Sequence, residues 1–113
     1  MLDIRVKESP QAITAYLDGE ADLKTSGQIL KHLGDLLECN PQPLIVVLDN
    51  LTFIDSRGLG ALVAIYHRAV EQASRFILVT SDAQMQRVMQ ITGLNKVMPI
   101  FTTREEALAS FEA

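Results

Sequence analysis

Residues 44–60 read Leu-Ile-Val-Val-Leu-Asp-Asn-Leu-Thr-Phe-Ile-Asp-Ser-Arg-Gly-Leu-Gly, and they decide the fold because they join an apolar strand to a helix. The aliphatic run 44–48 is typical of a central strand that is covered on both faces. The helix is predicted to follow Ser56, with apolar residues at i, i+3, i+4, i+7 and i+11. This predicted core stripe consists of Leu59, Leu62, Val63, Tyr66 and Val70. A strand that leads directly into a helix indicates an α/β domain.

Ser56 stands at the start of this helix. Backbone N–H groups in the first turn of a helix have no intrahelical acceptor, and the helix dipole is positive there. A phosphate on Ser56 is therefore predicted to occupy a prepared anion site. Asp and Ser are also the residue types that cap helices, so a purely structural role for Asp55 and Ser56 is the alternative interpretation.

Two glycines, Gly58 and Gly60, occupy the first turns of the same helix. Each costs about 1 kcal/mol relative to alanine, which indicates that another backbone approaches closely here. The side of the helix away from the core stripe is predicted to be apolar and to form a docking surface for a partner. Coverage of that side by another part of the fold is the alternative. The residues predicted to point outward are Ala61, Ala64 and Ile65, with Arg68 beside them.

The N-terminal part of the chain is predicted to form a β-hairpin. Apolar and polar residues alternate over 2–7 and 13–17, and a Pro-containing turn separates the two stretches. From Leu23 the spacing becomes helical, with Asp22 as the predicted N-cap. The apolar stripe of this first helix is Ile29, Leu30, Leu33, Leu36 and Leu37.

Strands and helices alternate in the C-terminal half. A short buried strand is predicted at 76–79, and Ser81-Asp82 begins a helix that Gly93 ends in the left-handed conformation. The predicted core residues of that helix are Met85, Val88, Met89 and Ile91.

A final strand is predicted at 96–100, and Thr102 or Thr103 is expected to cap a last helix that runs through Phe111. The predicted order is thus ββαβαβαβα. Alternation of this kind calls for right-handed crossovers and a mixed, mainly parallel sheet, to which the N-terminal hairpin adds an antiparallel pair.

Composition bounds the class of protein. The chain has 113 residues, 48% of them hydrophobic, and shows no linker, so residues 1–113 are interpreted as a single domain. The net charge is −4 and the ten basic residues are scattered, which argues against direct binding to nucleic acid. No apolar run approaches the roughly 20 residues of a membrane span, and no signal-peptide pattern is present. A cytoplasmic protein without membrane contact is expected, and its single Cys39 is interpreted as an incidental thiol.

The pattern around Ser56 does not favour an enzyme. The two histidines, His32 and His67, are poorly placed to act as its base, and the glycines do not flank it as Gly-x-Ser-x-Gly. The glycine-rich segment 58–63 echoes the dinucleotide-binding fingerprint but lacks its third glycine. No cofactor site is therefore predicted. No metal site is predicted either, because the sequence offers too few metal ligands.

Three segments together resemble a known family. Residues 17–22 (Leu-Asp-Gly-Glu-Ala-Asp) are similar to a turn before the first helix of the STAS domain, which is named for sulfate transporters and anti-sigma factor antagonists. Residues 51–60 resemble that domain's Asp-Ser-Ser/Thr-Gly-Leu-Gly signature, and residues 91–94 (Ile-Thr-Gly-Leu) resemble its late Ser/Thr-Gly-Leu turn. The resemblance covers nearly the whole chain and points to the stand-alone bacterial anti-sigma factor antagonists.

The resemblance implies a partner-switching regulator and not an enzyme. The unmodified antagonist would bind an anti-sigma factor that is also a serine kinase, and phosphorylation would release it until a serine phosphatase removes the mark. Ser56 matches the family's phosphorylated serine and Asp55 the aspartate before it, whereas Arg57 stands where the family usually has a second Ser or Thr. The predicted partner-binding residues are Asp22, Asp55, Ser56, Arg57, Gly58, Gly60, Ala61, Ala64 and Ile65.

Two further function classes remain open. A STAS scaffold or a subunit of a transport or signalling complex would hold partners together without phosphorylation. An enzyme that uses Ser56 as a nucleophile would be labelled by a serine-reactive probe, and no labelling is expected.

Overall fold

The computed structural model describes residues 1–112, and all statements below concern this range. Its elements are β1 (Leu2–Glu8), β2 (Ile13–Ala21), α1 (Ser26–Cys39), β3 (Leu44–Ile54), α2 (Ser56–Glu71), β4 (Phe76–Val79), α3 (Ala83–Ile91), α4 (Leu94–Val97), β5 (Ile100–Phe101), α5 (Arg104–Ala109) and a 3-10 turn, η1 (Ser110–Glu112).

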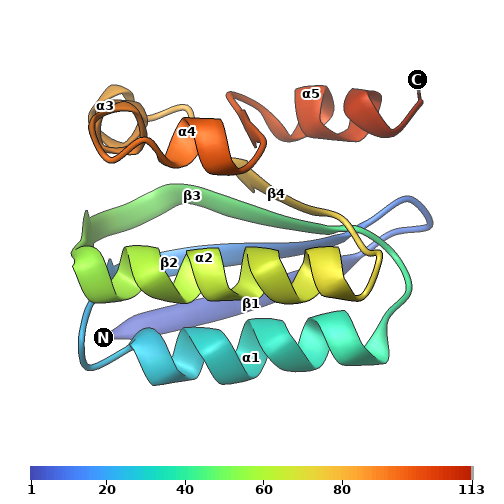
Figure 1. Cartoon of the computed structure of the whole chain (residues 1–113), viewed down its shortest axis with the longest axis horizontal. Coiled ribbons are helices and arrows are strands. Elements are labelled where there is room, and N and C mark those ends of the chain that lie inside the picture. Colours follow the sequence, from blue (N-terminus) through green and yellow to red (C-terminus); the bar gives the residue numbers. More distant parts are fainter. Residues whose placement is uncertain (113) are drawn as a thin grey trace.

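The five strands form one sheet in the order β1-β2-β3-β4-β5 (Figure 1). β1 and β2 pair antiparallel, whereas the β2–β3, β3–β4 and β4–β5 pairs are parallel. The α/β class, the mixed and mainly parallel sheet and the N-terminal hairpin are therefore confirmed. Because the parallel strands run in the same direction, their carboxyl ends lie at one end of the sheet, and the strand-to-helix junctions lie together there.

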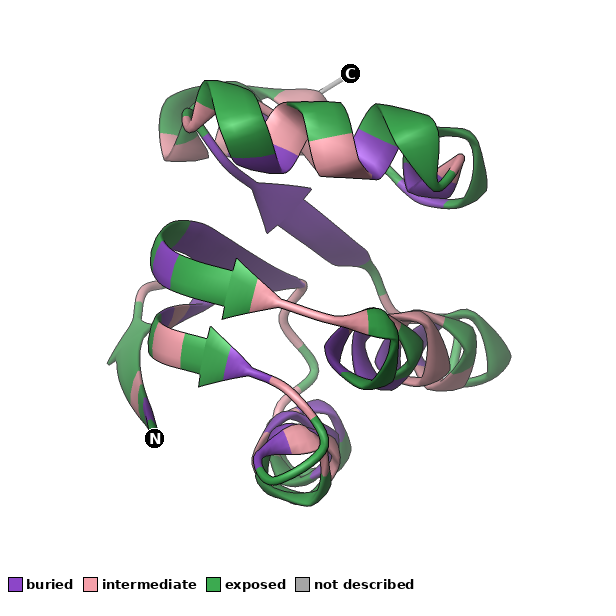
Figure 2. Ribbon diagram, turned by 90° about the vertical axis from the view of Figure 1, so that its left-hand side faces the viewer, coloured by how far each residue is buried: buried purple, intermediate pink, exposed green. Residues whose placement is uncertain are grey.

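Helices cover the two faces of the sheet unequally. α1 and α2 lie side by side on one face, and α5 lies on the other, where it contacts β3, β4 and β5 (Figures 1 and 2). The larger core cluster belongs to the α1–α2 side and includes Leu17, Ile29, Leu33, Leu48 and Leu62. Met85 and Met89 of α3 and Leu94 of α4 belong to the same cluster. A smaller cluster around Ile45, Val47, Ile77, Val79 and Ala107 lies under α5.

The predicted strand 96–100 is wrong in most of its length. Gly93 has the predicted left-handed φ of +75°, but the chain then forms the short helix α4 with Leu94 buried, and β5 contains only Ile100 and Phe101. Pro99 has no N–H to donate to a ladder, which limits the strand on that side. Ile91, predicted as core, is 75% exposed.

The helix ends follow their predicted caps in two of three cases. Asp82 accepts from the Gln84 N–H at the start of α3, and Thr103 forms a capping box with Glu106 at the start of α5. α1 begins later than predicted, at Ser26, because Asp22 caps the tight turn before it: the Asp22 carboxylate accepts from the N–H groups of Lys24 and Thr25. The α-helical part of the last helix ends at Ala109, and the 3-10 turn η1 continues it past the predicted end at Phe111.

Candidate functional site

The junction between β3 and α2 is held by Asp55. Its backbone is extended (φ −114°, ψ −173°), and its Oδ1 accepts from the N–H groups of Arg57 at 2.9 Å and Gly58 at 3.0 Å. Its own N–H donates to the Ala21 carbonyl at 3.1 Å, which ties the start of α2 to the end of β2. Asp55 is therefore the N-cap, and its backbone and side chain are both committed to the fold.

The prediction of a prepared anion site needs correction. The two N–H groups that would receive a phosphate in the first turn already donate to the Asp55 carboxylate. The site is thus filled by an anion of the chain itself, because a capping aspartate satisfies the same donors and the same dipole that attract a phosphate. A phosphate on Ser56 would lie beside that carboxylate.

Ser56 is the first residue of α2, and its side chain is exposed. Its hydroxyl makes no hydrogen bond to any residue in the range 1–112. Neither His32 nor His67 bonds to it within that range. The hydroxyl is accessible to an approaching protein, and the described residues provide no base to activate it.

The two glycines of α2 have different surroundings. A Cβ at Gly58 would collide with the carbonyl oxygen of Ala21 and would lie 2.8 Å from the Ala21 Cβ. Gly60 is exposed and has nothing within 4 Å of a Cβ position. The close approach inferred from the sequence therefore occurs within the molecule at Gly58, where α2 packs on β2, while Gly60 faces open space.

The predicted outward face of α2 is wrong for two of its residues. Ala61 and Ile65 are buried (3% and 0% exposed), and Ala64 is half-buried. The observed buried stripe lies one position earlier than predicted, which rotates the helix by about 100° about its axis. Small residues face inward because α2 packs closely on β2. The buried residues of α2 are Gly58, Ala61, Leu62, Ile65 and Ala69.

Arg68 is also committed to the fold. Its guanidinium passes over Gly34, where a Cβ would lie 3.0 Å from the Arg68 Cζ, and reaches Glu38 at 2.7 Å. Arg68 thus links α2 to α1 across a glycine. Of the residues near the junction, Arg57 and Gly60 remain exposed beside Ser56.

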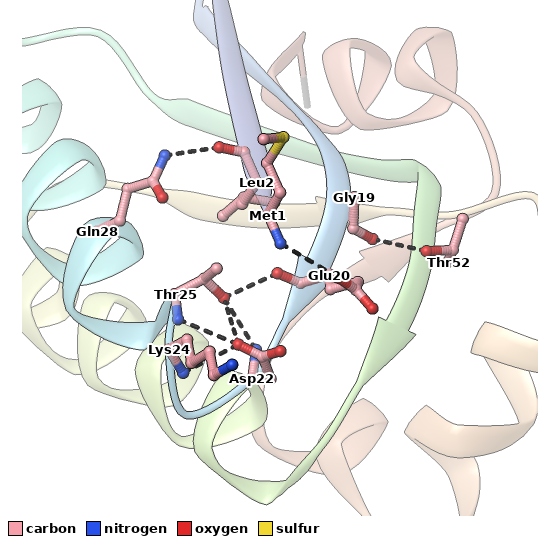
Figure 3. A network of polar contacts seen from close by, with 9 residues as sticks. All are labelled: Met1, Leu2, Gly19, Glu20, Asp22, Lys24, Thr25, Gln28 and Thr52. Carbon is pink, nitrogen blue, oxygen red and sulfur yellow. Dashed lines mark hydrogen bonds and ion pairs between the residues drawn. The ribbon is translucent and has the colours of Figure 1, made fainter.

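The turn between β2 and α1 lies next to the junction, because Ala21 pairs with Ile54. Asp22 is held inside this turn: the Thr25 hydroxyl accepts from the Asp22 N–H at 2.9 Å and donates to the Glu20 carbonyl at 2.7 Å (Figure 3). The half-buried Asp22 therefore shapes the surface near Ser56, and contact with a partner remains a prediction for it.

Two exposed apolar residues near the junction were not among the predicted site residues. Leu23, in the turn after β2, is 62% exposed, and Phe53, two positions before Asp55, is 49% exposed. The sequence contained a signal for Phe53, because this aromatic residue lies outside the continuous aliphatic run 44–48 that forms the buried part of the strand. Together they add apolar surface to the two segments that flank Ser56.

The fold and the β3–α2 junction can be compared with those of known proteins. A model of the STAS domain matches residues 3–107, which is nearly the whole chain. The chain belongs to the STAS domain family. Ser56 lies at the β3–α2 junction of this domain, and no helix in residues 1–112 has the length and apolar character that a membrane span requires.

Relatives within the STAS family carry regulatory names. An anti-sigma F factor antagonist from Paenibacillus polymyxa is 25% identical over 112 residues, which cover 98% of this chain and 96% of that protein. A crystal structure of an anti-sigma factor antagonist from Mycobacterium paratuberculosis superimposes with a TM-score of 0.90 at 24% identity, covering 100% of this chain and 96% of the other.

Another relative has solved structures in two phosphorylation states. SpoIIAA, an anti-sigma factor antagonist of Bacillus, has structures in its unphosphorylated and phosphorylated forms, each with a TM-score of 0.71 and identities of 22% and 24%. They cover 98% and 96% of this chain and 99% of theirs. Anti-sigma factor antagonists of this family are regulatory binding proteins. Within residues 1–112 no cluster of three or more His, Cys, Asp or Glu side chains is arranged to hold a metal ion.

Proposed function

We propose that this protein is an anti-sigma factor antagonist that acts by partner switching. Its unphosphorylated form binds an anti-sigma factor with serine kinase activity, phosphorylation of Ser56 releases it, and a serine phosphatase restores binding. The observation that carries the proposal is the hydroxyl of Ser56 at the β3–α2 junction of a STAS domain, because this hydroxyl is exposed and has no hydrogen-bond partner in residues 1–112. The names of the relatives support the same class of partner.

The surroundings of Ser56 suit a protein kinase substrate. The hydroxyl is free to enter a kinase active site, and Asp55 holds the backbone at both sides of the serine, so the acceptor is presented on a rigid turn. Exposed Leu23 and Phe53 supply apolar surface on the neighbouring segments. A rigid acceptor flanked by apolar residues lowers the entropic cost of binding.

The position of Asp55 explains how a phosphate would switch the surface. Phosphorylation adds about 1.5 to 2 negative charges. Because Asp55 already occupies the first-turn N–H groups, the phosphate would project toward solvent or toward a bound partner and would be repelled by the adjacent carboxylate. Arg57, the residue after Ser56, is exposed and would pair with the phosphate in the free protein.

The size of the switch can be bounded. A shift from 99% bound to 99% free needs about 5.5 kcal/mol of differential stability. Desolvating a phosphate dianion against a surface that fits a neutral hydroxyl, together with repulsion from acidic groups of the partner, is of the required order. A change of fold is not needed.

The first test is a kinase reaction with the cognate anti-sigma factor and ATP. Ser56→Ala is expected to bind the anti-sigma factor as tightly as the wild type and to incorporate no phosphate, while Ser56→Asp binds more weakly. Ser81→Ala is the matched control, since Ser81 is also an exposed serine between a strand and a helix. Full phosphate incorporation into Ser56→Ala would show that the acceptor lies elsewhere.

A further inference from the structure

A cavity at the far end of α2 is separate from the Ser56 surface. It has a volume of about 340 Å³ and is lined by residues of the C-terminal part of α2, the start of β4, the segment of β5 and the start of η1. Val70 lies 14 positions after Ser56, about 21 Å along the helix axis. A cavity of this volume is within the range of small-molecule sites.

The walls of this cavity are mainly apolar. Tyr66 and Val70 contribute from α2, and Pro99 and Phe101 contribute from the segment of β5. Val70 is 56% exposed, which is high for a valine on a helix that packs against a core. The Tyr66 ring meets the Phe76 ring edge-on at 6.3 Å between centroids, so the inner wall is rigid. Such walls fit an acyl chain or an apolar side chain.

At this cavity the β4 strand has backbone N–H and C=O groups that do not pair with β5. The N–H groups of Leu78 on β4 and of Thr80 just after it donate to the carbonyls of Pro99 at 3.1 Å and Phe101 at 3.0 Å. Alternation along the strand turns the N–H and C=O of Phe76 toward the same edge. The next rung would require an N–H from Pro99, which has none. β5 pairs only with Leu78 and Val79, so the Phe76 amide has no strand partner there in residues 1–112.

Two polar side chains adjoin this rung. The hydroxyl of Ser74 is buried and has no hydrogen-bond partner among the described atoms. The guanidinium of Arg75 lies 5.3 Å from the centre of the Phe111 ring, and no carboxylate of the described residues lies within 4.0 Å of it. This cation–π contact with Phe111 holds the Arg75 guanidinium at the rim of the cavity.

We propose that this cavity binds an N-acylated amino acid, a small ligand with an amide, an apolar group and a carboxylate. The ligand amide completes the rung, its C=O accepting from the Phe76 N–H and its N–H donating to the Phe76 C=O. The acyl chain lies between Tyr66, Val70 and Phe101, and the carboxylate accepts from Arg75. Each ligand group thus meets one feature of the cavity that the chain leaves open.

Titration of the isotope-labelled full chain with N-octanoylglycine, followed by amide chemical shifts, tests this site. Saturable shifts are expected at Phe76, Ile77 and Ser110, with a dissociation constant below about 1 mM. The neutral amide of the same ligand should bind about tenfold more weakly, because it lacks the charge that pairs with Arg75. In Arg75→Gln this preference should vanish.

Val70→Glu is the blocking variant. Val70 is largely exposed, so the substitution leaves the core intact while it places a carboxylate in the mouth of the cavity and abolishes the shifts. Ile91→Glu is the matched control, since Ile91 is an exposed apolar residue on α3 outside the cavity, and it should bind as the wild type. Absence of saturable shifts at about 10 mM ligand, equal binding by Val70→Glu, or equal binding of the neutral ligand to the wild type would overturn the proposal.

Discussion

Two strand-to-helix junctions lie at the carboxyl end of the parallel strands, and both combine one serine with one aspartate. At the β3–α2 junction Asp55 precedes Ser56, and at the β4–α3 junction Ser81 precedes Asp82. The aspartate caps the helix in each case. The serines differ, because the Ser81 Oγ donates to Asp49 at 3.1 Å whereas the Ser56 hydroxyl has no partner in the described range.

The difference shows which feature sets the β3–α2 junction apart. A capping aspartate is common to both junctions, so it identifies a helix start and nothing more. The order Asp-Ser places the serine one residue beyond the cap, on the exposed first turn. The order Ser-Asp leaves the serine in the loop, where its N–H and hydroxyl donate to Asp49 of the neighbouring strand β3. The free hydroxyl, and not the cap, distinguishes the first junction.

The largest expected change in stability is at Gly58, in the first turn of α2 after the β3–α2 junction. In Gly58→Ala the new Cβ collides with the backbone of Ala21, which costs roughly 3 kcal/mol. The higher helix propensity of alanine returns about 1 kcal/mol, so a net loss of about 2 kcal/mol in the free energy of unfolding is expected from urea denaturation. Gly60→Ala is the control and should gain roughly 0.5–1 kcal/mol. Equal stability of the two variants would contradict the packing described here.

The two caps should differ by a smaller amount. Asp55 accepts from two N–H groups and Asp82 from one, so Asp55→Ala should cost about 1–2 kcal/mol and Asp82→Ala about 0.5–1 kcal/mol. Thermal or urea unfolding of the two variants measures this difference. Asn at either position should restore most of the loss, since its side-chain oxygen can still cap. A larger cost at Asp82 would show that the hydrogen-bond count does not rank the caps.

The smallest expected difference in stability separates the two serines. Ser81→Ala should cost about 0.5 kcal/mol, because an exposed hydrogen bond to Asp49 is lost. Ser56→Ala should change the free energy of unfolding by less than about 0.3 kcal/mol, since surface substitutions without partners have little effect. Urea denaturation of both variants under one condition is the measurement. A clear loss of stability in Ser56→Ala would reveal a structural role for this hydroxyl.

Much of the fold was predictable because it follows local patterns. Alternation over 2–7 and 13–17 indicated the hairpin, and the aliphatic run 44–48 indicated a central strand. The caps at Asp82 and Thr103 were recognisable from residue type and position. The segment 96–100 was misassigned because a short apolar run does not distinguish a strand from a helical turn followed by an extended Pro residue.

The candidate site was predicted only in part. Asp55, Ser56 and their neighbours were found from a contiguous motif, whereas Phe53 and Leu23 were missed because each is a single apolar residue outside a periodic pattern. The rotation of α2 was also missed. Its sequence offers two apolar stripes one position apart, and the stripe of larger side chains is the less buried one.

The sequence by itself determined the α/β class, the order of most elements and the serine at the head of α2, because these depend on periodicity and on neighbours along the chain. Only the tertiary structure decided that Ala61 and Ile65 face inward, that Gly58 is required by Ala21, and that Asp55 already fills the anion site. The reason is physical: a helix can satisfy its local preferences at any rotation about its axis, and the rotation is chosen by how closely segments distant in sequence can pack.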